Sequence, residues 1–158
     1  MKIGVFYATM SGNTEAIADC IAECLVKSGF TPVLKEIPDI NHVEELKEYD
    51  LIFLGMYTWG DGDFPDECLD FVEEMGETQW DNTFALFGSG DTSYDDFCGA
   101  LDRLKPVLTS KGATIATNLL RIEMAPDKEE EEEIATFVKE ALDAASIRGN
   151  EIQSAKTV

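Results

Sequence analysis

Short apolar runs alternate along this chain with longer stretches in which apolar residues recur every three or four positions. Continuous apolar runs at Lys2–Ala8, Asp50–Met56 and Asn82–Phe87 predict strands that are covered on both faces. The run Thr31–Glu36 alternates apolar with polar residues, which predicts a strand nearer the edge of a sheet. The run Ala113–Ile122 predicts the last strand.

Helical periodicity predicts that helices connect these strands. The first helix is expected over Asn13–Ser28, with Gly29 as its end. The other expected helical segments are a short one within Pro38–Tyr49, one from Pro65 to about Met75, one over Phe97–Lys111 and a long final one that opens at Pro126 and Asp127. Pro106 is expected to kink the helix over 97–111 or to split it in two. Because strands alternate with helices, we expect an α/β fold with a parallel sheet and helices on both faces.

A length of 158 residues fits one ordinary domain. We expect this domain over residues 1–148, with a frayed tail over residues 149–158. The four cysteines do not have the spacing of a metal site. Cys20, Cys24 and Cys68 fall on the apolar faces of expected helices, so small buried thiols are the simpler interpretation, and no metal is expected.

The net charge of −20 restricts the classes of partner. It argues against nucleic acid and against an anionic membrane surface, both of which attract basic proteins. It favours electrostatic steering toward a basic partner. The chain begins as a strand at Lys2, and no apolar run approaches the length of a membrane span, so we expect a cytoplasmic protein.

The segment that follows the first strand has the composition of an anion-binding loop. It reads Thr9-Met10-Ser11-Gly12-Asn13-Thr14. Its hydroxyl groups, a glycine that lets backbone N–H groups approach a ligand, and the partly positive end of the next helix together favour a phosphate. The lysine of a P-loop is missing, so a single phosphate monoester fits better than a triphosphate. The alternative is an ordinary helix N-cap that is rich in Ser and Thr.

Two more loops follow the carboxyl ends of expected buried strands, at Tyr57–Phe64 and Gly88–Asp96. In a doubly wound sheet, ligands bind beyond the carboxyl ends of the strands, where the strand order reverses. If the three strands are neighbours, the three loops form one pocket. Trp59 and Tyr94, one in each loop, are then either core aromatics or stacking partners for the two faces of a flat ring.

These motifs resemble those of the flavodoxins. The likeness rests on the phosphate loop Thr9–Thr14, the run Thr58-Trp-Gly-Asp61 and the run Gly88-Ser-Gly-Asp-Thr-Ser-Tyr94, and it extends over essentially the whole chain. Flavodoxins are the type example of strand order 2-1-3-4-5 with FMN at the switch point, so that placement comes from the family. The resemblance therefore implies a doubly wound five-stranded parallel sheet of order 2-1-3-4-5 that binds FMN. The run after Gly112 lacks the long insertion of long-chain members, which implies the short-chain type.

The resemblance also implies a role for each matching residue. The segment Thr9–Thr14 would hold the phosphate, and Thr58 would add a contact on the phosphate and ribityl side. Trp59 and Tyr94 would flank the isoalloxazine. The remaining implied cofactor-binding residues are Gly60 and Asp61 at the N5 edge, Ser89, Gly90 and Asp91 on the pyrimidine side, and Phe97 and Cys98, with Cys98 near the flavin but not a redox participant. Tyr57 departs from the family pattern, in which a small residue is common, so its ring must turn away or cover the ribityl chain.

The implied function is a low-potential one-electron carrier that shuttles between semiquinone and hydroquinone and is not an enzyme. Its implied partners are flavin-containing NAD(P)H reductases and reductively activated acceptor enzymes, which would dock on an acidic rim of a monomer. Between Glu48 and Asp102 there is no Lys or Arg. The acids of this span that we expect to disfavour the second electron are Asp61, Asp63, Asp66, Glu67, Asp70, Asp91, Asp95 and Asp96.

Two other functions are compatible with the same order of strands and helices. One is an FMN-dependent NAD(P)H:quinone or flavin reductase, which would need a second substrate pocket that the sequence does not indicate. The other is a signalling receiver domain, which would need paired acids after the first strand and an Asp at the end of the third. Those positions hold Thr9, Met10 and Met56.

Overall fold

The structure is a computed structural model that describes residues 1–157. Over this range, six strands form one parallel sheet. They are β1 (Ile3–Tyr7), β2 (Val33–Glu36), β3 (Leu51–Tyr57), β4 (Thr83–Gly90), β5 (Thr114–Ile115) and β6 (Leu120–Glu123). The strand order is β2-β1-β3-β4-β5, with β6 also paired to β4. The predicted doubly wound parallel sheet and its order 2-1-3-4-5 are confirmed.

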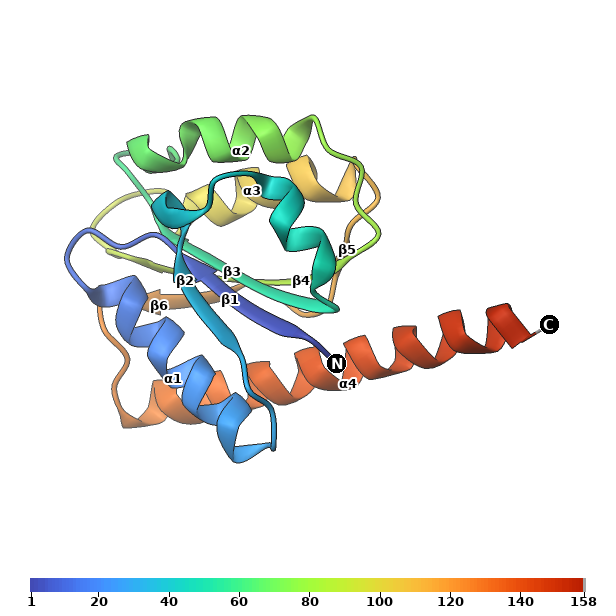
Figure 1. Cartoon of the computed structure of the whole chain (residues 1–158). Coiled ribbons are helices and arrows are strands. Elements are labelled where there is room, and N and C mark those ends of the chain that lie inside the picture. The colour runs from blue at the N-terminus through green and yellow to red at the C-terminus, as the bar shows by residue number, and fades with distance from the viewer. Residues whose placement is uncertain (158) are drawn as a thin grey trace.

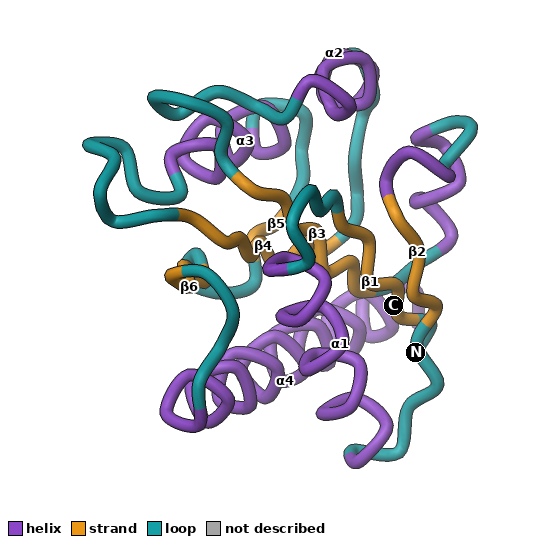
Figure 2. The backbone as a smooth tube through the Cα atoms, turned by 90° about the vertical axis from the view of Figure 1, so that its left-hand side faces the viewer, coloured by secondary structure: helices purple, strands orange, loops and turns teal. Residues whose placement is uncertain are grey.

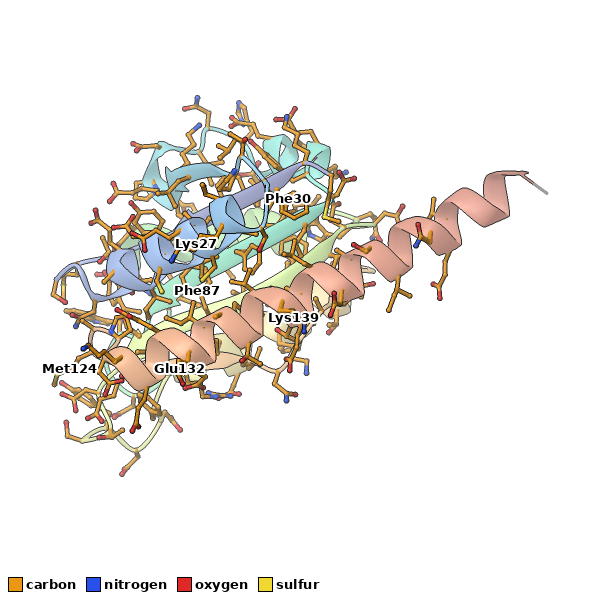
Figure 3. All side chains as sticks on the ribbon, turned by 90° about the horizontal axis from the view of Figure 1, so that it is seen from below. Lys27, Phe30, Phe87, Met124, Glu132 and Lys139 are labelled. Carbon is orange, nitrogen blue, oxygen red and sulfur yellow. The ribbon has the colours of Figure 1, made fainter. Side chains whose placement is uncertain are left out.

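Helices cover both faces of this sheet (Figure 1). One face carries α1 (Asn13–Lys27) and α4 (Lys128–Thr157), and the other carries α2 (Leu69–Gly76) and α3 (Gly99–Thr109). Three short 3₁₀ turns, Ile37–Asp39, Val43–Glu48 and Asp66–Cys68, lie in the connections. Figure 3 views the sheet from the side of α1 and α4 and shows Phe87 beneath them.

Strand residues alternate between the two cores, as the pleat of a strand requires. Val5 and Phe53 pack on the side of α1 and α4, whereas Phe6 and Ile52 pack on the side of α2 and α3. All four side chains are buried. Because β1 and β3 are covered on both faces, their sequences are apolar without interruption. By contrast, β2 is an edge strand, as its alternating sequence predicted.

The last position of the sheet differs from the prediction of one strand over Ala113–Ile122. The chain there forms two short strands, β5 and β6, which both pair with β4. In the register, Phe84 lies opposite Ile115 and Phe87 opposite Leu120. The stretch from Ile115 to Leu120 is therefore longer than the stretch from Phe84 to Phe87 that it faces. Its extra residues bulge out and interrupt the hydrogen-bond ladder with β4.

Other details of the elements also differ from the prediction. β4 continues to Gly90, so Gly88, Ser89 and Gly90 belong to the strand rather than to the loop. α3 runs through Pro106 without a split, because Pro106 lies on the exposed side of the helix, where water can bond the carbonyl left without a partner. α4 continues to Thr157, where we expected a frayed tail from residue 149, and residue 158 lies outside the described residues.

Among residues 1–157, no helix combines the length and apolar character needed to cross a bilayer.

The neighbouring strands β1, β3 and β4 are parallel, so their carboxyl ends meet at one edge of the sheet. Figure 2 looks onto this edge, from which the loops after these strands emerge. The three loops singled out in the sequence are thus neighbours in space.

Candidate cofactor-binding site

A pocket of about 530 Å³ opens at this edge, which is within the range typical of cofactor sites. Most of the residues expected to bind a cofactor line it. These are Met10, Ser11, Asn13, Thr58, Trp59, Gly60, Ser89, Gly90, Asp91, Tyr94 and Cys98. The expected residues that do not line it are Thr9, Gly12, Thr14, Asp61 and Phe97. Tyr57, Asp96 and Met124 complete the wall.

The first loop leaves a helix N-terminus free to bind a ligand. Gly12 is the N-cap residue of α1 and has a φ of 90°, which favours glycine. The Thr9 hydroxyl accepts a hydrogen bond from the Gly12 N–H at 3.0 Å, so Thr9 holds the shape of the loop. Because glycine has no side chain to cap the helix, the N–H groups of the first turn of α1 remain available to a phosphate or to water.

Thr14 and Ser89 form a buried hydroxyl pair. Their Oγ atoms are 2.6 Å apart, and both residues are buried. Thr14, expected to bind a phosphate, does not line the pocket, and its hydroxyl joins α1 to the end of β4. Ser89 also lines the pocket, so this hydrogen bond fixes the start of α1 relative to the wall that β4 contributes.

Ser89→Ala is expected to lower the free energy of unfolding of the cofactor-free protein by about 1–2 kcal/mol, because it leaves the buried Thr14 hydroxyl without a partner. Urea unfolding followed by circular dichroism measures the change. Ser28→Ala is a matched control that removes an exposed serine hydroxyl bonded to the Cys24 carbonyl at 3.0 Å. Equal effects of the two substitutions would contradict the importance of the buried pair.

The second loop is a tight hairpin that presents Trp59. The Trp59 N–H donates to the Asp63 carbonyl at 2.8 Å, and the Asp63 N–H donates to the Trp59 carbonyl at 2.9 Å. Gly60 and Gly62, within the hairpin, have φ values of 54° and 95°. These backbone conformations require little energy only for glycine. Trp59 is 47% exposed, so it is not a core residue.

The third loop presents Tyr94, which is 52% exposed. The Asp91 carboxylate accepts a hydrogen bond from the Ser93 N–H at 2.9 Å, which stabilises the turn and lowers the pKa of that carboxyl. Cys98 ends the loop in a left-handed conformation with φ 54°. Burial raises the pKa of its thiol to about 11, so the thiol is protonated at neutral pH.

Tyr57 lines the pocket, and its hydroxyl bonds Glu67, which is not among the lining residues. That hydroxyl lies 2.8 Å from each carboxylate oxygen of Glu67 and donates a hydrogen bond to the carboxylate. Burial, followed by this hydrogen bond, raises the pKa of Tyr57. The hydrogen bond fixes the hydroxyl at Glu67 while the residue stays at the wall of the pocket, so both arrangements expected for the ring remain open.

Two arginines from beyond residue 102 reach the region that the sequence showed as purely acidic. Arg103 pairs with Asp63 at 2.6 Å, and Arg121 pairs with Asp102. Asp63, one of the acids expected to disfavour the second electron, therefore has its charge partly offset by Arg103. Met124 was also missed, although it follows the carboxyl end of β6 at the same edge, where the order of strands could have indicated it.

The pocket fits a flat ligand that carries a phosphate. Trp59 and Tyr94 both line it and are about half exposed, so side chains do not fill the gap that they border. The uncapped N-terminus of α1 and the side chains of Ser11 and Asn13 supply neutral donors for an anion at the first loop. FMN has both chemical parts, and the residues present fit it.

Fold and site together define the class: a doubly wound α/β protein with a nucleotide site at the switch point of its sheet. The flavodoxin family model matches residues 5–137. Probable flavodoxin 2 of Bacillus subtilis is 46% identical over an alignment of 142 residues, with 86% of this chain and 91% of that protein covered. The oxidised flavodoxin 2 of Bacillus cereus superposes with a TM-score of 0.85 at 41% identity, covering 90% of this chain and 99% of that one. The flavodoxin of Streptococcus pneumoniae TIGR4 gives a TM-score of 0.86 at 31% identity, with 90% and 99% covered.

This chain therefore belongs to the flavodoxin family, as a short-chain member. It is an FMN-binding electron carrier rather than an enzyme. Neither the family nor these relatives favour the reductase alternative.

Proposed function

We propose that this protein passes single electrons at low potential from flavin-containing NAD(P)H reductases to reductively activated acceptor enzymes. Bound FMN supplies the one-electron chemistry. The observation that carries this proposal is the pair of half-exposed aromatic side chains, Trp59 and Tyr94, on one pocket beside the uncapped N-terminus of α1. An acidic surface at the same edge would oppose a second negative charge, which is the reason for a low second potential.

The proposed binding residues divide by the part of FMN that they face. Ser11, Asn13 and the first N–H groups of α1 would bind the phosphate, with Thr9 and Thr14 holding the loop in place. Trp59 and Tyr94 would exclude water from the two faces of the ring. Ser89 and Gly90 at the end of β4, and Asp91 directly after it, would face the polar edge of the ring. Thr58 would face the ribityl chain, although its Oγ already accepts the Ala100 N–H at 3.1 Å.

Gly60→Ala is expected to lower the potential for the first electron by about 40 mV. The Gly60 carbonyl would supply the hydrogen-bond acceptor at the N5 edge of the ring, through a turn of its peptide group. Such a bond contributes about 1 kcal/mol, or about 40 mV for one electron. Alanine would restrict the backbone of this hairpin, in which Gly60 has a positive φ, so the peptide would turn less freely.

Spectroelectrochemical titration measures this potential. Gly149→Ala is the control, because a Cβ at Gly149 meets no atom within 4 Å and the residue lies in α4. An unchanged first potential in Gly60→Ala would remove the carbonyl from the mechanism.

We also propose that partners dock on the acidic edge of a cytoplasmic monomer whose domain spans residues 1–148. Asp61, Asp66, Asp95 and Asp96 are exposed there and would attract basic surfaces. Steered association of this kind is fast and weakens as salt screens the charges.

The test uses the FMN-loaded protein with NADPH, a flavin-containing NADPH reductase and cytochrome c. We expect no oxidation of NADPH by the protein alone. We expect cytochrome c reduction when the reductase is added, at a rate that falls as salt is raised. Direct oxidation of NADPH would favour the reductase alternative, and failure of transfer at every salt concentration would overturn the proposal.

A further inference from the structure

The start of α3 contacts the loops that carry both aromatic side chains. The Thr58 hydroxyl accepts the Ala100 N–H at 3.1 Å, which ties the second loop to the first turn of α3. A Cβ on Gly99 would lie 3.0 Å from the Cα of Gly62 and 2.9 Å from the Cβ of Asp96. Residues of the second loop, the third loop and α3 are therefore in close contact, and a shift at the start of α3 would move both loops.

Arg121 bonds residues at this junction between the two loops and α3. It lies on β6 and does not line the pocket. Its Nη1 donates to the carbonyls of Phe97 and Cys98, each at 3.3 Å, and to Asp102 Oδ2 at 2.9 Å. Its Nη2 donates to the other carboxylate oxygen of Asp102. One guanidinium thus joins the end of the third loop to the first turns of α3.

The chemistry of this contact suits arginine alone. A planar guanidinium can bind a carboxylate with two parallel hydrogen bonds and still donate to neighbouring carbonyls, which a lysine ammonium cannot do in the same geometry. Cys98 has a positive φ, a conformation that costs a non-glycine residue energy. The bonds from Arg121 to the carbonyls of Phe97 and Cys98 stabilise the backbone at this residue.

A second arginine, on α3 itself, also bonds the second loop, but its contact is weaker. Arg103 pairs with Asp63 of the second loop, and the two side chains are 52% and 64% exposed. Exposed pairs contribute little to stability. The Arg121 side chain is 31% exposed and bonds two backbone carbonyls as well as Asp102, so it is the more important of the two.

We propose that Arg121 is a positioning residue for the flavin ring. It fixes the end of the third loop and the start of α3, and thereby the separation of Trp59 and Tyr94, without touching the cofactor. This inference rests on the proposed placement of the ring between those two side chains. Its physical basis is preorganisation: walls that are already spaced correctly need not be ordered when the ligand binds.

If Arg121 positions the ring, its replacement should weaken the binding of the ring and leave the binding of the phosphate unchanged. Arg121→Met is expected to weaken binding of FMN and of riboflavin by the same factor, about tenfold, because both ligands share the ring. Ser11→Ala, on the phosphate side, is expected to weaken FMN alone. The visible absorption of bound FMN should also shift in Arg121→Met, because the spacing of the stacked rings changes. Quenching of flavin fluorescence gives both dissociation constants.

Arg148→Met is a matched control for general destabilisation. Arg148 donates to Thr114 Oγ1 at 2.6 Å, to the Asp81 carbonyl at 3.0 Å and to the Asp81 carboxylate at 2.6 Å. Like Arg121 it bonds both a carboxylate and a backbone carbonyl, but its partner Asp81 precedes β4, away from the pocket. We expect its flavin constants and spectrum to match those of the unmodified protein. If Arg121→Met does not fold, Asp102→Asn tests the same contact, with an expected loss of about threefold for both ligands.

The outcomes separate this inference from the function on which it rests. Equal losses for FMN and riboflavin in the Arg121 or Asp102 variants, with none in Arg148→Met, would support it. Flavin constants and spectra that match those of Arg148→Met, or a loss confined to FMN, would overturn it. If Trp59→Leu and Tyr94→Leu also leave riboflavin binding unchanged, the proposed placement of the ring is wrong. If they weaken it while Arg121→Met does not, only the positioning role is wrong.

Discussion

Trp59→Leu and Tyr94→Leu, made together, are expected to weaken FMN binding by about a hundredfold. Each aromatic side chain is about half exposed in the cofactor-free pocket and would cover one face of the ring. Loss of one stacked face costs about 1–2 kcal/mol, which is about tenfold in the dissociation constant. Since the two faces are separate contacts, we expect the two losses to add in free energy. Fluorescence titration of the cofactor-free protein with FMN measures each constant.

The control removes exposed apolar side chains that do not line the pocket. Val26 on α1 is 61% exposed and Ile147 on α4 is 60% exposed. Val26→Ala with Ile147→Ala should leave the FMN constant unchanged. A loss of less than about threefold in the double aromatic variant would mean that the ring does not lie between the two side chains.

Asp61→Asn, Asp95→Asn and Asp96→Asn, made together, are expected to raise the potential for the second electron by about 50 mV. At water's dielectric, a carboxylate about 10 Å from an added negative charge raises the free energy of that charge by about 0.4 kcal/mol. This is about 17 mV for one electron, so three neutralised acids give about 50 mV. Potentiometric titration at low salt measures the shift, and higher salt should reduce it.

A control with the same change in net charge separates local from general effects. Glu77→Gln, Glu140→Gln and Asp143→Asn neutralise three exposed acids that do not line the pocket. We expect a much smaller shift from them. Arg103→Gln should lower the potential for the second electron, because it leaves the Asp63 carboxylate without its partner at 2.6 Å. Equal shifts in the two triple variants would refute the local electrostatic effect.

The position of the pocket could be predicted because it depends on features that local sequence encodes. Apolar runs identify β1, β3 and β4, and the polar loops after them are then known to lie at one edge if those strands are neighbours. Periodicity does not say which strands are neighbours. That order came from the resemblance to flavodoxins, and the pairing of β1 and β4 with β3 confirms it.

The orientation of side chains within the loops could not be predicted in the same way. The sequence places a hydroxyl at Thr14, but only the packing of α1 against the sheet directs it toward Ser89. Likewise, Arg103 and Arg121 lie outside the acidic span in sequence. They reach it because α3 and β6 return to the same edge. A count of charges over one stretch of sequence does not include ion-pair partners that come from elsewhere in the chain.

The split of the final strand was missed for a related reason. Ala113–Ile122 contains enough apolar residues for one strand, yet the register along β4 leaves room for fewer residues than the segment contains. Strand propensity is local, whereas register depends on the partner strand.

The direction of α4 has a practical consequence for electrochemistry. The helix ends at the side of the molecule opposite the three loops, beyond the point where Arg148 anchors it to Asp81 and Thr114 (Figure 1). A protein immobilised on a solid support by a linker at that end would present its redox face outward, with Trp59 and Tyr94 directed toward a diffusing mediator.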